Sequence, residues 1–398
     1  MTNEPKKSGR HGAATSIHDK VKPHSMRVAG LFAGIGGLEL GLANAGHKTK
    51  LLCELDASAA AVLKHRFPSL PNVPDVRDVG RLTGIDLLCA GFPCQDLSSV
   101  GQKKGIRGSQ SSLVDEVFRV LESSSIDWVL LENVRFMLHL KRGEAMRRIA
   151  SRLEELGYKW AYRVLNSEAF GVPHRRHRVF ILASRTGDPR AVLLGEDAVK
   201  QPVNATPLTL EKPLGFYWTE GTYAVGLTRN GVPPLKGGSS IGIPSPPAIL
   251  LPDGFVGTPD LRDTERLQGF SMDWTEAAES TGKRASRWKL VGNAVTVPVA
   301  EWLGGRLGSG GHYVEEEPEE VGKVWPSAAW CMGGKRYVSN VSEAPVSRPT
   351  GIDSFLHYPL KPLSRRATDG FLKRAEAGSM KFPDGFLSAL QSHSSRSI

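Results

Sequence analysis

The chain has 398 residues of ordinary composition, and its 51 lysines and arginines outnumber its 41 acidic residues. This length supplies a hydrophobic core without covalent staples, and the net charge of +10 favours a polyanionic partner. The four cysteines stand at unrelated spacings, which suggests neither a disulfide framework nor a zinc site. No apolar run approaches the ~20 residues that span a bilayer, so we expect no membrane association and a reducing, cytoplasmic location.

Residues 1–25 are polar and lack periodicity, which predicts a disordered extension and makes Met26 an alternative start. From Arg27 to about Arg185, short apolar runs alternate with amphipathic stretches, which is typical of an α/β fold with a doubly wound, mostly parallel sheet. One helix is expected over 143–156, with Gly157 as its stop. The predicted strands are 27–33, 49–54, 85–90, 127–132, 160–166 and 178–184.

After Arg185, glycine and proline become frequent and the alternation of strands and helices is lost. We therefore predict a catalytic domain over 26–185 and a small, loop-rich lobe over 186–262. The stretch 263–307 is expected to return to the catalytic domain and to complete it with a turn that runs into a helix. The tail, 308–398, has an acidic run and a basic, helical end, and its role stays open between a supporting segment and a partly disordered extension.

A glycine-rich loop, FAGIGG at 32–37, closes the first predicted strand and opens a helix. Its glycines allow backbone amides to approach a ligand at the start of that helix. Glu54 ends the next strand, where a carboxylate binds ribose hydroxyls. Glu39 occupies the place of the third glycine of a dinucleotide fingerprint and would oppose a pyrophosphate, which favours S-adenosylmethionine over NAD. A tight turn without a ligand is the alternative interpretation.

Three kinds of reactive side chain follow at successive strand edges. Cys94 comes after an apolar run, in GFPCQ, where α/β folds present nucleophiles. Glu132 ends another strand, and Arg176 and Arg178 precede a third. A thiolate that adds to carbon 6 of cytosine activates carbon 5 toward a sulfonium methyl group. Glu132 would neutralise the ring nitrogen and Arg178 would hold the carbonyl oxygen of a base flipped out of the duplex, with the polar loop 95–108 closing over it.

Each of these residues also has a purely structural interpretation. Cys94 alone is most often a buried, inert side chain, Glu132 a carboxylate at a helix start, and the arginines a solvated or phosphate-binding face. Their occurrence together, in order, at successive strand ends favours the catalytic interpretation. His174 and His177 have no carboxylate or cysteine nearby in ligand spacing, so no metal is expected.

Residues 27 to about 304 resemble the cytosine-5 DNA methyltransferase family in six blocks that stand in the family's order. The blocks are FAGIGG at 32–37, GFPCQ at 91–95, ENV at 132–134, GVPHRRHR at 171–178, RDTERLQGF at 262–270 and GNAV at 292–295. The resemblance implies the Rossmann-like fold of S-adenosylmethionine-dependent methyltransferases. It also implies a bacterial enzyme of the restriction–modification or solitary type that methylates carbon 5 of cytosine.

The same resemblance implies roles for single residues in catalysis. Cys94 is the implied nucleophile, and Glu132 the residue on the cytosine ring nitrogen. Arg176 and Arg178 correspond to the two arginines of the family's motif, with Arg178 nearest the base.

The resemblance also implies a pocket for S-adenosylmethionine as co-substrate. Glu54 would bind its ribose and Leu55 the face of its adenine. Asp75 and Asp78 both suit a contact with the adenine amino group, and Asp75 has the better spacing to Cys94. The remaining implied pocket residues are Phe32, Gly34, Gly36, Gly37, Pro93, Leu113, Asn293 and Val295.

Two features depart from the family's pattern. His174 stands where the family usually has glutamine, which leaves the orientation of the arginine cluster less certain. The segment that corresponds to the family's target-recognition region covers only about 186–260, while the tail after GNAV is unusually long. That tail is therefore a second place for DNA recognition or for support.

The implied partner is double-stranded DNA, bound between the two lobes by a monomer, because a single flipped base requires no dimer. The expected location is the prokaryotic cytoplasm, at the nucleoid. The sequence leaves open which DNA sequence is recognised and whether a separate restriction endonuclease accompanies the protein. The alternatives are a transfer RNA cytosine-5 methyltransferase, a catalytically silent DNA-binding protein of the same fold, and a Rossmann dehydrogenase, which Glu39 disfavours.

Overall fold

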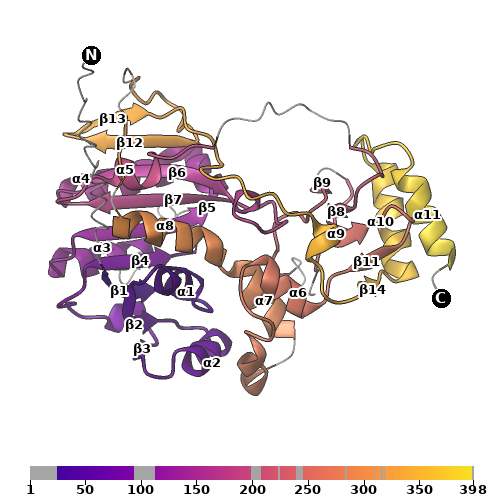
Figure 1. Ribbon diagram of the computed structural model, residues 1–398, viewed down its shortest axis with the longest axis horizontal. Coiled ribbons are helices and arrows are strands. Elements are labelled where there is room, and N and C mark those ends of the chain that lie inside the picture. Colours follow the sequence, from indigo (N-terminus) through magenta and orange to yellow (C-terminus); the bar gives the residue numbers. More distant parts are fainter. Residues whose placement is uncertain are drawn as a thin grey trace, which may run out of the picture.

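The structure, a computed structural model, describes residues 25–93, 113–198, 208–222, 225–238, 245–282, 285–309, 311–314, 317 and 319–396. The predicted disordered extension, apart from Ser25, and the predicted mobile loop 95–108 lie outside these residues. Two lobes stand side by side, each built on its own sheet, and the carboxyl terminus lies in the smaller one (Figure 1).

Among the described residues, the large lobe is built on a nine-stranded sheet with the order β13-β12-β6-β7-β5-β4-β1-β2-β3. All six predicted strands are confirmed, and their ends differ from the prediction by no more than two residues. The strands are β1 (Arg27–Leu31), β2 (Lys48–Cys53), β3 (Asn72–Val73), β4 (Leu87–Gly91), β5 (Trp128–Val134), β6 (Lys159–Asn166), β7 (His177–Ser184), β12 (Ala328–Met332) and β13 (Lys335–Val338).

The sheet is mostly parallel, as predicted, but β7 and β12 run opposite to their neighbours. The reason for the reversal of β7 is the length of its connection. Only residues 167–176 join β6 to β7, and parallel neighbours need a crossover of a dozen or more residues. The link between β12 and β13 is shorter still, because it consists only of Gly333 and Gly334, both at positive φ.

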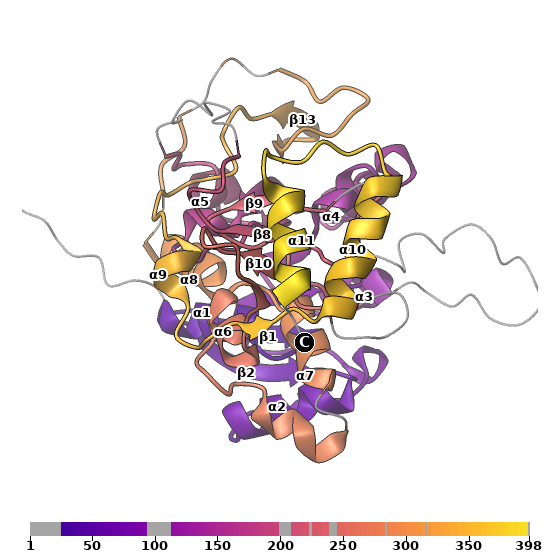
Figure 2. The same cartoon turned by 90° about the vertical axis from the view of Figure 1, so that its right-hand side faces the viewer.

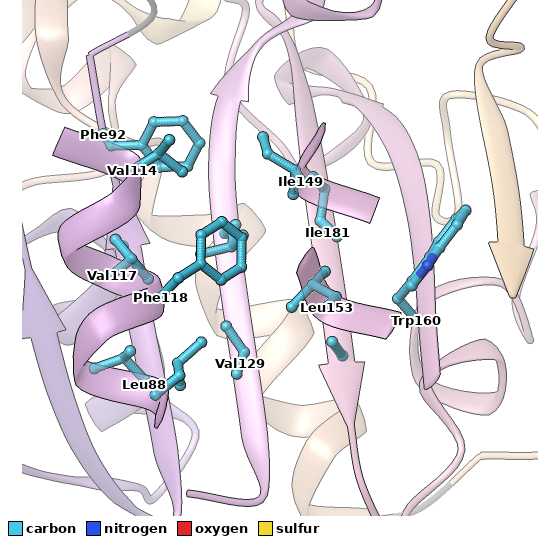
Figure 3. Packing of buried hydrophobic residues seen from close by; sticks show 14 of the residues in the cluster. Leu88, Phe92, Val114, Val117, Phe118, Val129, Ile149, Leu153, Trp160 and Ile181 are labelled. Carbon is cyan, nitrogen blue, oxygen red and sulfur yellow. The ribbon is translucent and has the colours of Figure 1, made fainter. Parts of the chain in front are cut away.

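Helices cover both faces of the large sheet, which confirms the doubly wound architecture. Alternate residues of one strand point to opposite faces, so in β4 Leu88 packs on one side and Leu87 on the other. Figure 3 shows the first side, where Phe118 of α3 and Ile149 of α4 lie over the strands. The opposite face is covered by α1, α5 and α8.

The helix predicted over 143–156 is confirmed as α4, and Gly157 follows it at a φ of +79°. The α-helices are α1 (Gly37–Asn44), α2 (Ala57–Arg66), α3 (Leu113–Ser123), α4 (Glu144–Glu155), α5 (Pro189–Leu193), α6 (Leu261–Leu267), α7 (Ala285–Asn293), α8 (Val297–Ser309), α9 (Ile352–Phe355), α10 (Arg365–Ala377) and α11 (Phe386–Arg396). The 3-10 helices are η1 (Val76–Asp78), η3 (Arg135–Leu138), η4 (Leu140–Gly143), η5 (Ser167–Ala169) and η6 (Glu276–Thr281). None of the helices in the described ranges is long and apolar enough to cross a bilayer.

The second lobe, which we call the small lobe, consists of a five-stranded sheet with α10 and α11 packed against it (Figure 2). Its order is β14-β11-β10-β8-β9, and every pairing is antiparallel. Phe216 of the sheet packs against Phe371 of α10 and Phe386 of α11, with ring centroids 5.1 and 5.2 Å away. The strands are β8 (Leu214–Phe216), β9 (Thr228–Arg229), β10 (Ala248–Leu250), β11 (Val256–Thr258) and β14 (Lys361–Pro362).

The tail therefore contributes to both lobes. Its first part supplies β12 and β13 at the edge of the large sheet beside β6. Its last part supplies β14, α10 and α11, so the small lobe draws on residues well outside the segment 186–262.

The GNAV block lies where the chain returns to the large lobe, but it is not simply a turn before a helix. Gly292 and Asn293 end α7, and α8 begins at Val297 after three intervening residues. Helix α8 packs closely on α1, where a Cβ on Gly41 would stand only 2.5 Å from the Cβ of Ala300. Glycine at this crossing allows the two backbones to approach.

Candidate active site

A cavity of about 900 Å³ opens at the carboxyl ends of the parallel strands β1, β2, β4 and β5. This edge is where α/β folds bind ligands. Eleven of the predicted site residues line the cavity: Phe32, Gly34, Glu54, Leu55, Asp75, Pro93, Leu113, Glu132, Arg176, Arg178 and Asn293. The strand order β5-β4-β1-β2 separates Glu132 from Glu54 by three strand spacings, or about 14 Å. We call the part near Glu54 the cofactor end and the part near Glu132 the base end.

At the cofactor end, Glu54 holds the glycine-rich loop in place. One of its carboxylate oxygens accepts a hydrogen bond from the Gly34 amide at 2.7 Å, and the other accepts one from the Asp56 amide, also at 2.7 Å. Burial raises the pKa of Glu54, and the two amides oppose that shift. Each oxygen has a second lone pair, so the carboxylate can still accept hydrogen bonds from a ligand. Leu55 lines the cavity with 70 % of its surface exposed, which leaves a large apolar face open to a ligand.

Of the two candidate adenine contacts, Asp75 lines the cavity, whereas Asp78 is exposed and is not among the lining residues. Asp75 caps η1 by accepting a hydrogen bond from the Arg77 amide, and its carboxylate pairs with the Arg77 guanidinium. That pairing lowers the pKa of Asp75 to about 2, so the carboxylate is ionised near neutral pH. An ionised carboxylate at this position is a hydrogen-bond acceptor for an amino group.

At the base end, the buried Glu132 and the half-buried Arg178 form an ion pair, with 3.2 Å between Nε of Arg178 and a carboxylate oxygen of Glu132. The reversed direction of β7 makes this contact, because Glu132 stands opposite Phe180 and therefore diagonal to Arg178 on the neighbouring strand. In a parallel arrangement, the start of β7 would lie at the far edge of the sheet. Burial raises the pKa of Glu132, and the positive charges of Arg178 and Arg176 oppose that shift.

Arg176 is fully buried beside this pair but is held by backbone carbonyls. Its Nη1 donates to Leu235 O at 3.1 Å and its Nη2 to Ala294 O at 2.9 Å. Its Nε has no hydrogen-bond partner among the described residues.

Cys94, the predicted nucleophile, lies outside the described residues. The residues at the two ends of that gap, Pro93 and Leu113, both line the cavity. The approach to Cys94 is braced by Asn133, whose side-chain amide donates to Phe92 O at 2.9 Å. Asn133 is part of the ENV block, so this block supplies both a carboxyl group and a support for the strand end that precedes Cys94.

Three predicted pocket residues, Gly36, Gly37 and Val295, are not among the lining residues. Gly36 has a φ of +86°, and a Cβ there would stand 2.6 Å from the ring of Phe67. A Cβ on Gly37 would stand 2.4 Å from Val295 O. These glycines allow the loop to pack closely against its surroundings.

The expectation that Glu39 would face a bound phosphate is wrong. Glu39 lies on the inner side of α1 with 1 % of its surface exposed, and the Cys89 thiol donates to its Oε1 at 3.7 Å. Its carboxyl group packs so closely on β1 that a Cβ on Gly30 would collide with it. The choice between NAD and S-adenosylmethionine therefore cannot rest on this residue.

Sequence reasoning missed Lys289, which also lines the cavity and whose Nζ lies 3.1 Å from the Asp56 carboxylate. This contact joins α7 to the start of α2. It could not be predicted from a motif, because Lys289 and Asp56 lie far apart in the sequence. Within the described ranges, no group of three or more histidine, cysteine or acidic side chains is arranged to hold a metal ion.

Comparison with known proteins identifies the family. The C-5 cytosine-specific DNA methylase family matches residues 26–217. The chain is 46 % identical over 379 residues to the type II methyltransferase M2.BsuMI of Bacillus subtilis (strain 168), covering 92 % of this chain and 97 % of that protein. The chain belongs to the C-5 cytosine-specific DNA methylase family.

Two further matches have a lower sequence identity. The type II methyltransferase M.PspPI of Psychrobacter sp. (strain TA137) is 30 % identical over 327 residues, which cover 69 % of this chain and 77 % of M.PspPI. The crystal structure of S. pombe Dnmt2 methyltransferase matches with a TM-score of 0.51 and 18 % identity over 71 % of this chain and 98 % of that one. At that identity the match supports the methyltransferase fold alone. Membership of the DNA methylase family leaves no support for the dehydrogenase alternative.

Proposed function

We propose that this DNA methylase transfers a methyl group from S-adenosylmethionine to carbon 5 of a cytosine flipped out of a short, specific sequence in double-stranded DNA. The observation that carries the proposal is one continuous cavity with the Glu132–Arg178 ion pair at its base end and the loop held by Glu54 at its cofactor end. A site that joins a pocket for a nucleoside to a pocket for a planar, polar ring suits the transfer of a methyl group from the bound nucleoside to the bound ring.

The side chains at the cofactor end fit S-adenosylmethionine. The exposed Leu55 would cover the face of the adenine, and Asp75 would accept a hydrogen bond from its amino group. Glu54 would bind the ribose hydroxyls with its free lone pairs while it holds the Gly34 amide. Phe32, Pro93, Leu113 and Asn293 would form the remaining wall.

When bound, S-adenosylmethionine supplies an electrophilic methyl group on a sulfonium. The Cys94 thiolate forms a bond to carbon 6 of cytosine, and carbon 5 then forms a bond to the methyl group while the sulfonium–methyl bond breaks. A base removes the proton from carbon 5, and the thiolate leaves carbon 6. Arg176 and Arg178 provide the positive charge that favours ionisation of the thiol.

Glu132 and Arg178 stabilise the charge that develops on the ring. Glu132 in its protonated form, which burial favours, donates to the ring nitrogen. Arg178 donates to the carbonyl oxygen, and its existing pair with Glu132 keeps both groups in position before the base arrives.

Duplex DNA is the proposed partner, and the positive balance of charge supports it. The target base must leave the stack to reach a cavity of this kind, at a cost of a few kcal/mol. The small lobe would read the neighbouring base pairs. We propose that the protein acts as a monomer, in a bacterial cytoplasm, with or without a separate restriction endonuclease.

The test is expression in a host that lacks cytosine methylation, followed by bisulfite sequencing of the host DNA. We expect methylation at one short motif with the wild type and none with Cys94→Ala. Cys331→Ala is the matched control, because Cys331 is a buried cysteine in β12 that does not line the cavity, and this variant is expected to methylate normally. Methylation that persists in Cys94→Ala would remove Cys94 from the mechanism.

A second experiment separates the alternatives. The purified protein is incubated with labelled S-adenosylmethionine and either duplex DNA or transfer RNA, and a duplex with a fluorinated cytosine at the target is used to trap the adduct. Transfer to DNA and a denaturation-resistant adduct support the proposal. Transfer to transfer RNA alone, or DNA binding without any transfer, would refute it.

A further inference from the structure

A short stretch of the chain next to β9, residues 232–238, lies between the arginine motif and the end of α7. We call it the strut. Its first residue pairs with the arginine motif, because the Val232 amide donates to Pro173 O and the Arg175 amide donates to Val232 O, both at 2.9 Å. Its other end presses on Gly292, where a Cβ would stand 2.3 Å from the carbonyl carbon of Lys236. The strut therefore contacts the arginine motif at one end and Gly292, a residue that lines the cavity, at the other.

His174 fixes the middle of the strut through two hydrogen bonds. The Leu235 amide donates to Nε2 of His174 at 2.9 Å, so that nitrogen carries no proton. The proton sits on Nδ1, which donates to Leu267 O at 3.3 Å. His174 is completely buried, and this burial, with the charges of Arg176 and Arg178, lowers its pKa well below the ordinary value and keeps it neutral.

The other side of the Leu235 residue is held by Arg176, whose Nη1 donates to Leu235 O. His174 and Arg176 thus form hydrogen bonds with the amide and the carbonyl of the same residue, Leu235. We infer that His174 is a positioning residue for methyl transfer: it fixes Leu235, and Leu235 in turn fixes the Arg176 guanidinium at the base end. The inference rests on the proposed function, since it concerns the same cavity.

The same geometry explains how histidine occupies a position where the family usually has glutamine. A neutral imidazole with its proton on Nδ1 offers one acceptor and one donor, and a glutamine amide offers the same pair. His174→Gln should therefore keep both hydrogen bonds. His174→Leu removes both and leaves the buried Leu235 amide and Leu267 carbonyl unpaired, which would drive the strut to move and carry Arg176 with it.

The chain offers a matched control in His47, which is also buried and also joins two backbone groups. Its Nδ1 accepts from the Met26 amide at 3.0 Å, and its Nε2 donates to Gly304 O at 2.9 Å. His47 lies beneath α1 and α8 and is not among the cavity's lining residues. His47→Leu therefore makes the same chemical change at a place remote from Arg176.

The experiment measures single-turnover methyl transfer from labelled S-adenosylmethionine to unmethylated bacterial chromosomal DNA, per molecule of folded protein that binds S-adenosylmethionine. We expect His174→Leu to lower the rate about tenfold or more, and His174→Gln to stay within about threefold of the wild type. His47→Leu should lower the thermal midpoint without lowering the rate. Affinity for S-adenosylmethionine should stay within about threefold in all three variants.

Three results would overturn the inference: a wild-type rate in His174→Leu, a rate in His174→Gln as low as in His174→Leu, or an equal loss of rate in His47→Leu. The last would show that the loss follows from stability alone. A wild-type protein that is folded and binds S-adenosylmethionine but methylates no DNA would instead refute the proposed function, and the positioning role with it.

Discussion

Glu39 makes the stability of the protein depend on pH in a way that can be measured. Its carboxyl group is buried between α1 and the large sheet, and its Oε2 has no hydrogen-bond partner among the described residues. Burial away from water penalises the ionised form and raises the pKa from 4.5 to about 7. The replacement Glu39→Gln keeps the shape of the side chain and removes the ionisation.

The direction of the effect follows from the two states. Below pH 4.5 the carboxyl group is protonated in both the folded and the unfolded chain, and stability does not depend on it. Between 4.5 and about 7 the unfolded chain releases the proton while the folded chain keeps it, so the free energy of unfolding falls as the pH rises. Above that interval both states are ionised, and the loss is constant at about 3 kcal/mol.

Glu39→Gln should therefore lack this loss. Its extra buried N–H donor costs about 1–3 kcal/mol if it finds no partner, but that cost is the same at every pH. The prediction concerns how stability changes with pH: from about pH 5 to about pH 8, the free energy of unfolding of the wild type should fall by about 2.5 kcal/mol more than that of the variant.

Urea unfolding followed by tryptophan fluorescence, at several values of pH, measures the difference. Glu301→Gln is the matched control. The exposed carboxylate of Glu301, in α8, accepts a hydrogen bond from Asn44, which ends the helix α1 that contains Glu39. This control is expected to follow the wild-type profile. Parallel pH profiles for the wild type and Glu39→Gln would refute the reasoning, since Glu39 would then be ionised in the folded protein at little cost.

Three further changes test other parts of the molecule. Glu132→Gln should lower the rate of methyl transfer by about 10²–10³-fold without weakening S-adenosylmethionine binding, because glutamine cannot give a proton to the cytosine ring nitrogen as negative charge develops there. An unchanged rate would contradict this role. Gly37→Ala would place a Cβ 2.4 Å from Val295 O, so we expect a loss of about 1–3 kcal/mol in thermal unfolding, and an unaltered midpoint would argue against this contact. Phe371→Ala should destabilise the small lobe by about 3–5 kcal/mol and weaken DNA retardation in gels while S-adenosylmethionine binding, measured by calorimetry, persists.

The six predicted strands of the large lobe were visible in the sequence because each contains a short run of apolar residues, and all but β2 are buried on both faces along most of their length. The strands of the small lobe were not predicted, since β8, β10 and β11 have three residues each and are too short to display an alternating pattern. Nor did the sequence predict that α10 and α11 complete this lobe. Their partner Phe216 lies more than a hundred residues earlier, and only packing brings them together.

The sequence by itself determined which chemistry to expect of this protein: it predicts a cysteine, a carboxyl group and two arginines near strand ends, with a glycine-rich loop for a nucleoside. Those residue types restrict the reaction, because few other side chains supply a nucleophile, a proton donor and a carbonyl-binding cation. Only the tertiary structure decided which groups meet. The reversal of β7 brings Arg178 to Glu132, the fold of α1 turns Glu39 inward, and the strut joins His174 to Arg176. Such contacts depend on strand direction and on packing between segments far apart in the chain, and no local pattern of residues encodes either.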